Sequence, residues 1–223
     1  MRKKELAKLI DHTLLGPTAS ADGVRQVCQE ARENGFASVC VNPCHAQLVH
    51  ELLRGTDVKT CVVIGFPHGM TGAEVKAFEA GKAIAVGAQE LDMVANIASL
   101  KEGDYATVIE DIRAVCAAAD KAPHPVLVKV ILETSLLDDQ EKAAGAILAK
   151  AGGANFVKTS TGFGPGGATV EDVALLRRTV GDMMGVKAAG GIRDYETASR
   201  MIEAGATRIG ASRSLAILSG ATE

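Results

Sequence analysis

The chain has 223 residues and a formal net charge of -3 at pH 7, with 47% hydrophobic and 23% charged residues, values that exclude a disordered tail, a collagen-like fibre and a supercharged module. Aromatic residues make up only 3% of the chain, so nucleic acid is excluded as a partner because both the phosphate-neutralising charge and the base-stacking rings are missing. We therefore expect the partner to be a small molecule.

Short runs of β-branched and small apolar residues recur along the chain, with helical segments between them. The first run, residues 9–14, is weaker than the others and precedes a helix predicted over residues 22–34. Seven further runs follow at residues 36–41, 58–64, 89–94, 126–132, 155–158, 185–188 and 207–210. Short, nearly continuous apolar runs are typical of parallel strands that helices cover.

Four of these runs begin just after a glycine that is expected to end the preceding helix in a left-handed conformation: Gly35, Gly87, Gly153 and Gly205. Eight strands with no linker or shift in composition favour an α/β fold, a (β/α)8 TIM barrel that forms a single domain over residues 1–223 with a short N-terminal extension. The alternative is an open doubly wound sheet. That fold would need a glycine-rich dinucleotide loop after its first strand, and none is found.

The sequence also indicates where the protein resides. Lys8 and Asp11 interrupt the segment in which a signal peptide would have its apolar core. No stretch approaches 18 consecutive apolar residues, so no membrane span is expected. Five cysteines at irregular spacings are typical of free thiols in a reducing compartment. We expect a cytoplasmic protein with no membrane partner.

Three charged residues, Asp92, Lys158 and Lys187, lie within predicted strands. Because strand side chains alternate between two faces, each is expected to point away from its apolar neighbours and into the barrel. Barrel enzymes carry their chemistry at the carboxyl ends of the strands. For one isolated lysine, a buried structural ion pair would be the simpler interpretation.

Two lysines favour a catalytic role. Lys158 and Lys187 are expected on adjacent strands, about 4.8 Å apart at the backbone. Two ammonium groups ~5 Å apart repel by roughly 3 kcal/mol at an effective dielectric constant near 20. That repulsion would leave one of the pair unprotonated near neutral pH, as a nucleophilic amine requires. The sequence therefore suggests Schiff-base chemistry with a carbonyl substrate.

Other charged strand residues have less certain roles. Asp11 and Lys129 either extend the same interior network or only balance its charge, and both interpretations stay open. Lys129 could also pair with Glu133, which ends the same strand. The histidines at positions 12 and 68 are isolated in the sequence and are expected on loops or at the surface.

Glycine-rich turns follow the last three predicted strands and contain Gly162, Gly190, Gly191 and Ser212. Such turns leave backbone N–H groups free, and in barrels the turns after the last strands commonly hold a phosphate. A phosphorylated substrate is therefore expected. No metal site is expected, because no second Cys/His pair completes the one at Cys40, Cys44 and His45.

Taken together, these segments resemble the deoxyribose-phosphate aldolases, a family of class I aldolases of deoxyribose catabolism. The resemblance runs nearly end to end and rests on IDHTL at 10–14, SVCVNP at 38–43, VIGFP at 63–67, ELDMV at 90–94, FVKTSTG at 156–162 and GGIR at 190–193. It implies reversible cleavage of 2-deoxy-D-ribose 5-phosphate to acetaldehyde and D-glyceraldehyde 3-phosphate, without a metal or an organic cofactor. A homodimer is also expected from it.

The resemblance assigns roles to individual residues. Lys158 matches the Schiff-base lysine, while Asp92 and Lys187 match the pair that transfers protons; the choice of Lys158 over Lys187 as nucleophile comes from the resemblance alone. The supporting network would comprise Asp11, Thr13 and Lys129, and the phosphate would rest on Gly162, Gly190, Gly191 and Ser212.

The sequence departs from the family at a few positions. Arg213 stands where many members carry a small residue, and it would either add a cation to the phosphate site or point away from it. His68 replaces a residue that is commonly apolar. Two other functions stay open: a different phosphate-binding barrel lyase or isomerase, in which Asp92 alone does acid–base work, and a non-catalytic barrel that binds a sugar phosphate.

Overall fold

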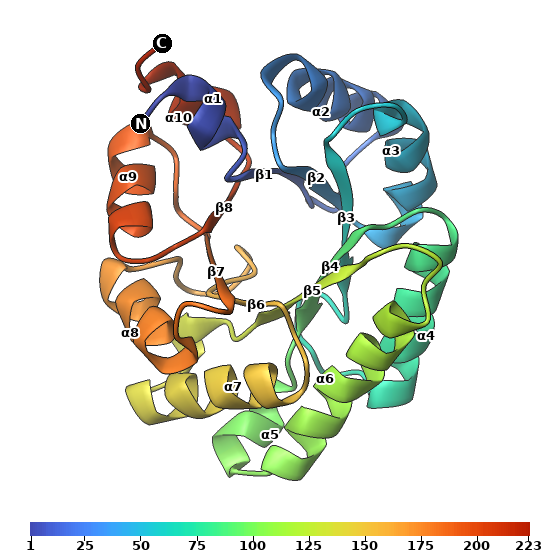
Figure 1. The fold of residues 1–223 in the computed structure, drawn as a ribbon. Helices are drawn as coiled ribbons and strands as arrows, with labels where there is room; N and C mark the ends of the chain where they lie inside the picture. The colour runs from blue at the N-terminus through green and yellow to red at the C-terminus, as the bar shows by residue number, and fades with distance from the viewer.

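Eight parallel strands close into a barrel in the computed structural model, which describes residues 1–223. Each strand pairs with its neighbours in chain order, and the pairing of β1 with β8 closes the ring (Figure 1). The strands are β1 (Ile10–Leu14), β2 (Ser38–Val41), β3 (Lys59–Ile64), β4 (Glu90–Val94), β5 (Leu127–Ile131), β6 (Phe156–Lys158), β7 (Gly185–Ala189) and β8 (Arg208–Ala211). The predicted barrel is confirmed, and the open doubly wound sheet is wrong because no strand is left at an edge.

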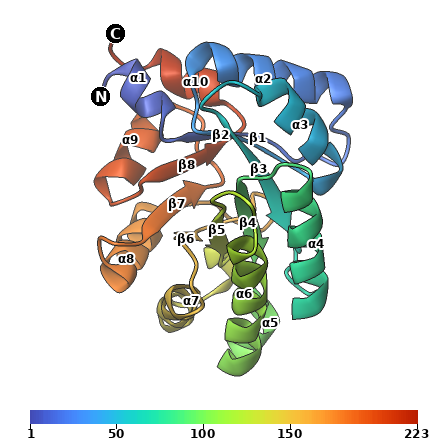
Figure 2. The same cartoon turned by 45° about the vertical axis from the view of Figure 1, so that its right-hand side comes forward.

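The helices form a ring outside the barrel (Figures 1 and 2). They are α1 (Lys3–Ala7), α2 (Ala21–Asn34), α3 (Ala46–Leu53), α4 (Ala73–Ala85), α5 (Ile97–Glu102), α6 (Tyr105–Asp120), α7 (Asp139–Ala151), α8 (Val170–Val180), α9 (Tyr195–Glu203) and α10 (Ser214–Ser219), with 3-10 turns η1 (Pro43–His45) and η2 (Thr134–Leu136). None of the helices combines the length and the apolar character needed to cross a bilayer.

The N-terminal extension is α1, which packs beside α10 so that the two chain ends lie together (Figure 1). A bridge between Arg2 and Thr222 joins them, and Leu6 of α1 is fully buried. The first segment of the chain thereby helps to hold the last helix against the barrel.

Alternation along the strands separates two interiors. Outward-pointing strand residues such as Val62, Leu91 and Val157 belong to one large apolar core between the strands and the helices. Inside the barrel the apolar cluster is small and includes Cys40 and Cys61. The remaining space inside the barrel therefore accommodates charged side chains.

Strand register brings those charged residues to the same level. Lys158 of β6 is directly paired with Lys187 of β7, and Asp92 of β4 with Lys129 of β5. Asp11 of β1 is paired with Gly210 of β8, a position without a side chain. The C-beta of any other residue at position 210 would lie 3.0 Å from the Lys187 Cε. Glycine there leaves room for the lysine side chain.

Candidate active site

Asp92 lies at the centre of the charged cluster inside the barrel. Its Oδ2 accepts hydrogen bonds from Lys158 Nζ at 2.8 Å and from Lys187 Nζ at 2.7 Å. Its Oδ1 accepts one from Lys129 Nζ at 2.8 Å. All four side chains are buried. The three residues predicted to face the interior meet there, and one carboxylate oxygen lies between the two lysines of interest.

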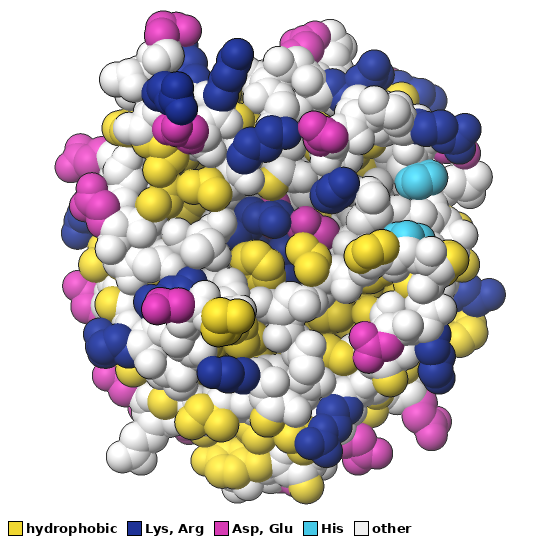
Figure 3. Space-filling view, viewed as in Figure 1, with side chains coloured by type: hydrophobic (Ala, Val, Ile, Leu, Met, Phe, Trp, Pro, Cys, Tyr) yellow, Lys and Arg dark blue, Asp and Glu magenta, His cyan; other side chains and the backbone are white.

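A second layer of ions surrounds this centre. Asp11 pairs with Lys187 and, at 2.6 Å, with Arg208 Nη1. Glu90 pairs with Lys129 Nζ at 2.6 Å and with Arg208 Nη1 at 2.9 Å. Asp11 and Lys129 therefore pair with the charges around Asp92, which fits both interpretations of their role. Figure 3 shows Lys or Arg and Asp or Glu side chains together in the centre of the ring of helices.

Glu90 and Arg208 were not among the predicted site residues, although the sequence holds a signal for both. Glu90 lies two residues before Asp92 on the same strand and therefore on the same face, and Arg208 is a cation within the last predicted strand.

The cluster contains one more cationic side chain than it has carboxylates. The cations are Lys129, Lys158, Lys187 and Arg208, and the carboxylates are Asp11, Glu90 and Asp92. A buried charge without a partner is strongly disfavoured. The cluster is therefore electrically balanced when one of its lysines has lost its proton.

The contacts distinguish Lys158 from the other two lysines. Lys158 pairs with Asp92 alone, whereas Lys187 pairs with two carboxylates and Lys129 with three. Deprotonation of Lys158 therefore breaks the fewest ion pairs. Strand alternation alone did not separate Lys158 from Lys187, and their carboxylate partners differ in number.

Protonation of the neighbouring groups follows from the same contacts. Burial acts to lower the pKa of Lys187, but the carboxylates of Asp11 and Asp92 outweigh it and raise that pKa above its usual value. Burial acts to raise the pKa of Asp92, but Lys129, Lys158 and Lys187 hold it well below its usual range. At neutral pH Lys187 is an ammonium and Asp92 a carboxylate.

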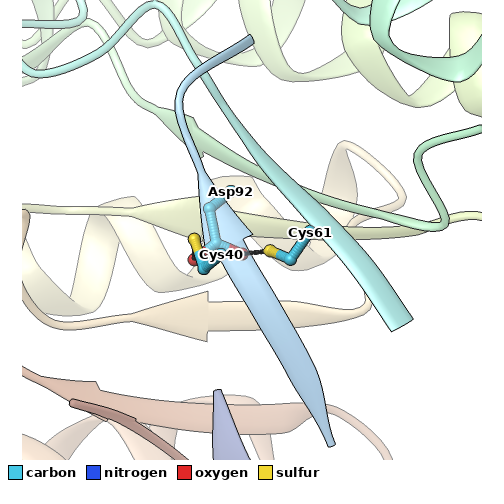
Figure 4. A group of neighbouring side chains, drawn as sticks. All are labelled: Cys40, Cys61 and Asp92. Carbon is cyan, nitrogen blue, oxygen red and sulfur yellow. Dashed lines mark hydrogen bonds between the residues drawn. The ribbon is translucent and has the colours of Figure 1, made fainter. Parts of the chain in front are cut away.

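Two thiols flank Asp92 in Figure 4, Cys40 from β2 and Cys61 from β3. The three residues are close enough to resemble a metal site. However, Cys61 Sγ donates to Asp92 Oδ1 at 3.2 Å, and burial raises the pKa of the Cys61 thiol well above its usual value. Asp92 is also in contact with three lysine amino groups. A protonated thiol in such cationic surroundings does not fit a metal ion.

A cavity of about 270 Å³ opens beside Lys158, the only member of the charged cluster that lines it. The rest of its lining comes from the carboxyl ends of β1, β7 and β8 and from the segments that follow β1, β6, β7 and β8: Thr13, Leu15, Thr161, Gly162, Ala189, Gly190, Gly191, Ile192, Arg193, Gly210, Ala211, Ser212 and Arg213. All four residues expected to hold a phosphate therefore lie together at the cavity. Arg213 lies there as well, so the cavity has cationic residues on two of its turns.

Thr13 is the one residue of the expected supporting network that lies outside the ion cluster. It stands two positions beyond Asp11 on β1, nearer the cavity, and its hydroxyl donates to the Asp11 backbone oxygen at 2.9 Å. Thr13 therefore lies at the cavity beside Lys158 and outside the layer of ions, and its supporting role stays a prediction.

The expected surface position of His12 is also wrong. His12 is buried, its Nδ1 lies 2.8 Å from Ser214 Oγ, and its Nε2 lies 2.7 Å from Glu30 Oε2. These partners come from α2 and α10, far from His12 in the chain, so no local pattern pointed to them. His68 is exposed on a loop, as predicted.

The suggested pairing of Lys129 with Glu133 does not form. The strand ends at Ile131, and Glu133 then adopts a left-handed backbone conformation. Its carboxylate turns toward the loop after β6, where it accepts hydrogen bonds from Thr161. The rule that residues four apart share a strand face therefore does not apply at Glu133.

Comparison with known proteins gives one consistent result. The sequence profile of the DeoC/LacD family aldolases matches residues 6–221. The chain is 55% identical to a deoxyribose-phosphate aldolase of Caldanaerobacter subterraneus subsp. tengcongensis, covering 98% of this chain and 96% of that protein. It is 56% identical to one of Clostridium perfringens, covering 99% and 97%. A solved deoxyribose phosphate aldolase from Aeropyrum pernix, described as a unique tetramer, superposes with a TM-score of 0.90 at 35% identity, covering 97% of this chain and 91% of that one.

Proposed function

The chain belongs to the DeoC/LacD aldolase family, and from this membership we propose that it cleaves 2-deoxy-D-ribose 5-phosphate reversibly to acetaldehyde and D-glyceraldehyde 3-phosphate through a Schiff base on Lys158. It is a carbon–carbon lyase that acts on small sugar phosphates. The observation that supports the mechanism best is the single Asp92 oxygen, which lies within hydrogen-bond distance of both Lys158 and Lys187.

The first step is attack of the unprotonated Lys158 amine on the aldehyde carbon of the substrate. The carbonyl oxygen takes up a proton to give a carbinolamine, and loss of water then gives an iminium. Lys187 holds protons that this step needs, since Asp11 and Asp92 raise its pKa. Asp92 Oδ2, between the two lysines, is positioned to accept the proton that the attacking nitrogen releases, so that the two protons on the departing oxygen come from that nitrogen and from Lys187.

Cleavage follows from the iminium. A base removes the proton of the C3 hydroxyl, the bond between C2 and C3 breaks, and its electron pair moves to the iminium nitrogen to form an enamine. D-Glyceraldehyde 3-phosphate leaves. The enamine is then protonated on carbon, and water hydrolyses the resulting iminium to release acetaldehyde and free Lys158. Asp92 and Lys187 transfer the protons of these steps.

The phosphate of the substrate rests on the turns that line the cavity. Backbone N–H groups around Gly162, Gly190, Gly191 and Ser212 bind its oxygens, and Arg213 contributes positive charge. Support comes from the convergence of these turns on one cavity together with Lys158.

Residues 1–223 act as one barrel domain, in the cytoplasm and as a homodimer. The continuous barrel and the single core between its strands and helices support one domain. The tetrameric relative from Aeropyrum pernix supports association of some kind. Sedimentation velocity of the purified chain tests the dimer, and a monomer at micromolar concentration would rule it out.

Borohydride trapping tests the mechanism directly. The protein is incubated with acetaldehyde and reduced, and peptide mass spectrometry is expected to find an added ethyl group on Lys158. The Lys158→Met variant should gain none. An adduct on Lys187 instead would show that Lys187 is the nucleophile. No adduct at all would favour an isomerase or a non-catalytic binding protein.

A further inference from the structure

Glu133 has a backbone conformation that requires an explanation. Its φ is 43°, which makes it the one non-glycine residue of the chain with a positive φ. L-amino acids other than glycine adopt this region at a cost in free energy, and such residues gather where function holds them. Glycine would adopt the same conformation without strain, but it has no carboxylate.

The Glu133 carboxylate is buried without a cation. Its residue is 3% exposed, and no Lys, Arg or His lies within ion-pair distance of it. Oε2 accepts hydrogen bonds from both the backbone N of Thr161, at 3.2 Å, and the Thr161 hydroxyl. Oε1 accepts one from Ser135 Oγ at 3.3 Å. Neutral donors from the loop after β6 and from η2 therefore satisfy this buried carboxylate.

The same loop is fitted closely around the carboxylate. The Thr161 hydroxyl also accepts from the backbone N of Phe163 at 3.0 Å, which makes the turn continuous with the Glu133 contact. At position 164, a C-beta would lie 2.6 Å from Glu133 Cδ, so only glycine leaves room for it. The carboxylate thus fixes residues 161–164 from one side.

Those residues contribute to the cavity. Thr161 and Gly162 line it together with Lys158. Lys158 itself is held from elsewhere, through Asp92 and through the pairing of β6 with β7. The contact with Glu133 therefore acts on the part of the loop that meets the substrate and leaves the amine in place.

We propose that Glu133 is a positioning residue that fixes the β6–α8 loop, through Thr161, in the conformation that binds the phosphorylated end of the substrate. The inference rests on the proposed function for the identity of that substrate. It also explains the strained backbone of Glu133. The left-handed conformation just after β5 points the Glu133 carboxylate toward the β6–α8 loop.

Two pairs of variants test it. Glu133→Gly relieves the backbone strain and removes the carboxylate, while Glu133→Gln keeps an acceptor oxygen. Thr161→Val removes the donor hydroxyl, while Thr161→Ser keeps it. Ser135→Ala is the matched control, because it removes only the contact to the other carboxylate oxygen.

We expect Glu133→Gly and Thr161→Val to raise KM for 2-deoxy-D-ribose 5-phosphate, and Kd for D-glyceraldehyde 3-phosphate by calorimetry, by about 10- to 100-fold. Glu133→Gln and Thr161→Ser should keep most of the wild-type affinity, and the affinity of Ser135→Ala should be close to that of wild type. The rate of acetaldehyde trapping on Lys158 should not change, and Glu133→Gly should unfold at no lower urea concentration than wild type. A structural role alone would leave the affinity of a stably folded Glu133→Gly intact.

Unchanged Kd in folded Glu133→Gly, or an equal loss of acetaldehyde trapping, would overturn the proposal. If Glu133→Gly is unstable, the comparison of Thr161→Val with Thr161→Ser decides, and equal affinities for these two would also overturn it. Failure of the proposed function looks different, because wild type itself would then form no adduct, while the calorimetric comparison would still report on the loop.

Discussion

Lys187 is the residue whose charge should set the pH at which Lys158 reacts. We predict that Lys187→Met lowers kcat at pH 7 by about 100-fold, because the cluster is then balanced with Lys158 as an ammonium and about 3 kcal/mol of repulsion is lost. Since the loss is one of protonation, part of the rate should return as the pH is raised toward 10. The measurement is the pH profile of kcat and of acetaldehyde trapping.

Lys187→Arg keeps the positive charge and serves as the control. The midpoint of the pH profile of Lys187→Arg should lie at the same pH as that of wild type, even where kcat is lower. If Lys187→Met showed an unshifted profile, charge repulsion would not be the means by which the Lys158 amine is freed.

Arg213 is a residue of this chain for which the family pattern gave no role. Since it lines the cavity with the glycine turns, we predict that Arg213→Ala raises KM for 2-deoxy-D-ribose 5-phosphate by about 10-fold, the size of one charge-assisted contact. KM for unphosphorylated 2-deoxy-D-ribose should be unaffected. Equal effects on both substrates in steady-state kinetics would show that Arg213 does not bind the phosphate.

The residues at the centre of the candidate site could be predicted from the sequence, and those around it could not. Asp92, Lys158 and Lys187 could be found because strand alternation is a local rule that holds along each strand. Glu133 and His12 could not, because their partners lie on loops or helices that only the folded chain brings near. Strand alternation likewise could not choose between Lys158 and Lys187, and only the resemblance to the family did.

At the scale of elements, helices α4 and α6 are joined by a buried ion pair. Lys76 Nζ lies 2.5 Å from Asp111 Oδ2 and donates to the Val94 backbone oxygen at 2.8 Å. Removing one partner leaves a buried charge alone, so Lys76→Met should lower the free energy of unfolding by about 3–5 kcal/mol. Urea denaturation measures the change.

The double variant Lys76→Met/Asp111→Leu should recover much of that stability, because both charges are then absent. The exposed pair of Lys8 and Asp57, 3.8 Å apart, is the control, and Lys8→Ala should change the free energy of unfolding by less than about 1 kcal/mol. Similar losses for Lys76→Met and Lys8→Ala would contradict the prediction.

Element bounds were largely predictable. Every observed strand lies within two residues of its predicted run, since turns and left-handed glycines such as Gly35 mark where helices stop and strands follow. Closure of the barrel was not visible in any one segment. It depends on the pairing of β1 with β8, whose residues are almost 200 positions apart.

At the scale of the whole molecule, the buried ions predict how stability depends on pH. The pKa values of Asp11 and Asp92 are held below their usual 3.8 because nearby lysines outweigh burial. Their contribution is present above about pH 4 and is lost as the pH falls further. Burial raises the pKa values of Cys28 and Cys116 to about 11. Their contribution is present below about pH 9 and is lost as the pH rises through 11.

We therefore expect the free energy of unfolding to be nearly constant between about pH 5 and 8 and to fall on both sides. Urea titrations at half-unit steps from pH 3 to 10 measure this. The acid limb should flatten in an Asp92→Asn variant, which cannot titrate at that position. A stability that rose steadily toward pH 3 would contradict the assignment.

The surplus of one cation inside the barrel also affects the intermediate that forms on Lys158. An iminium there has the same positive charge as the ammonium that the surroundings disfavour, so it is unusually electron-demanding and draws the electron pair of the breaking carbon–carbon bond toward nitrogen. A phosphate dianion at the cavity mouth offsets part of this positive potential. Phosphorylated sugars would thus form the intermediate at lower free energy than neutral ones, so the phosphate contributes to the chemistry as well as to binding.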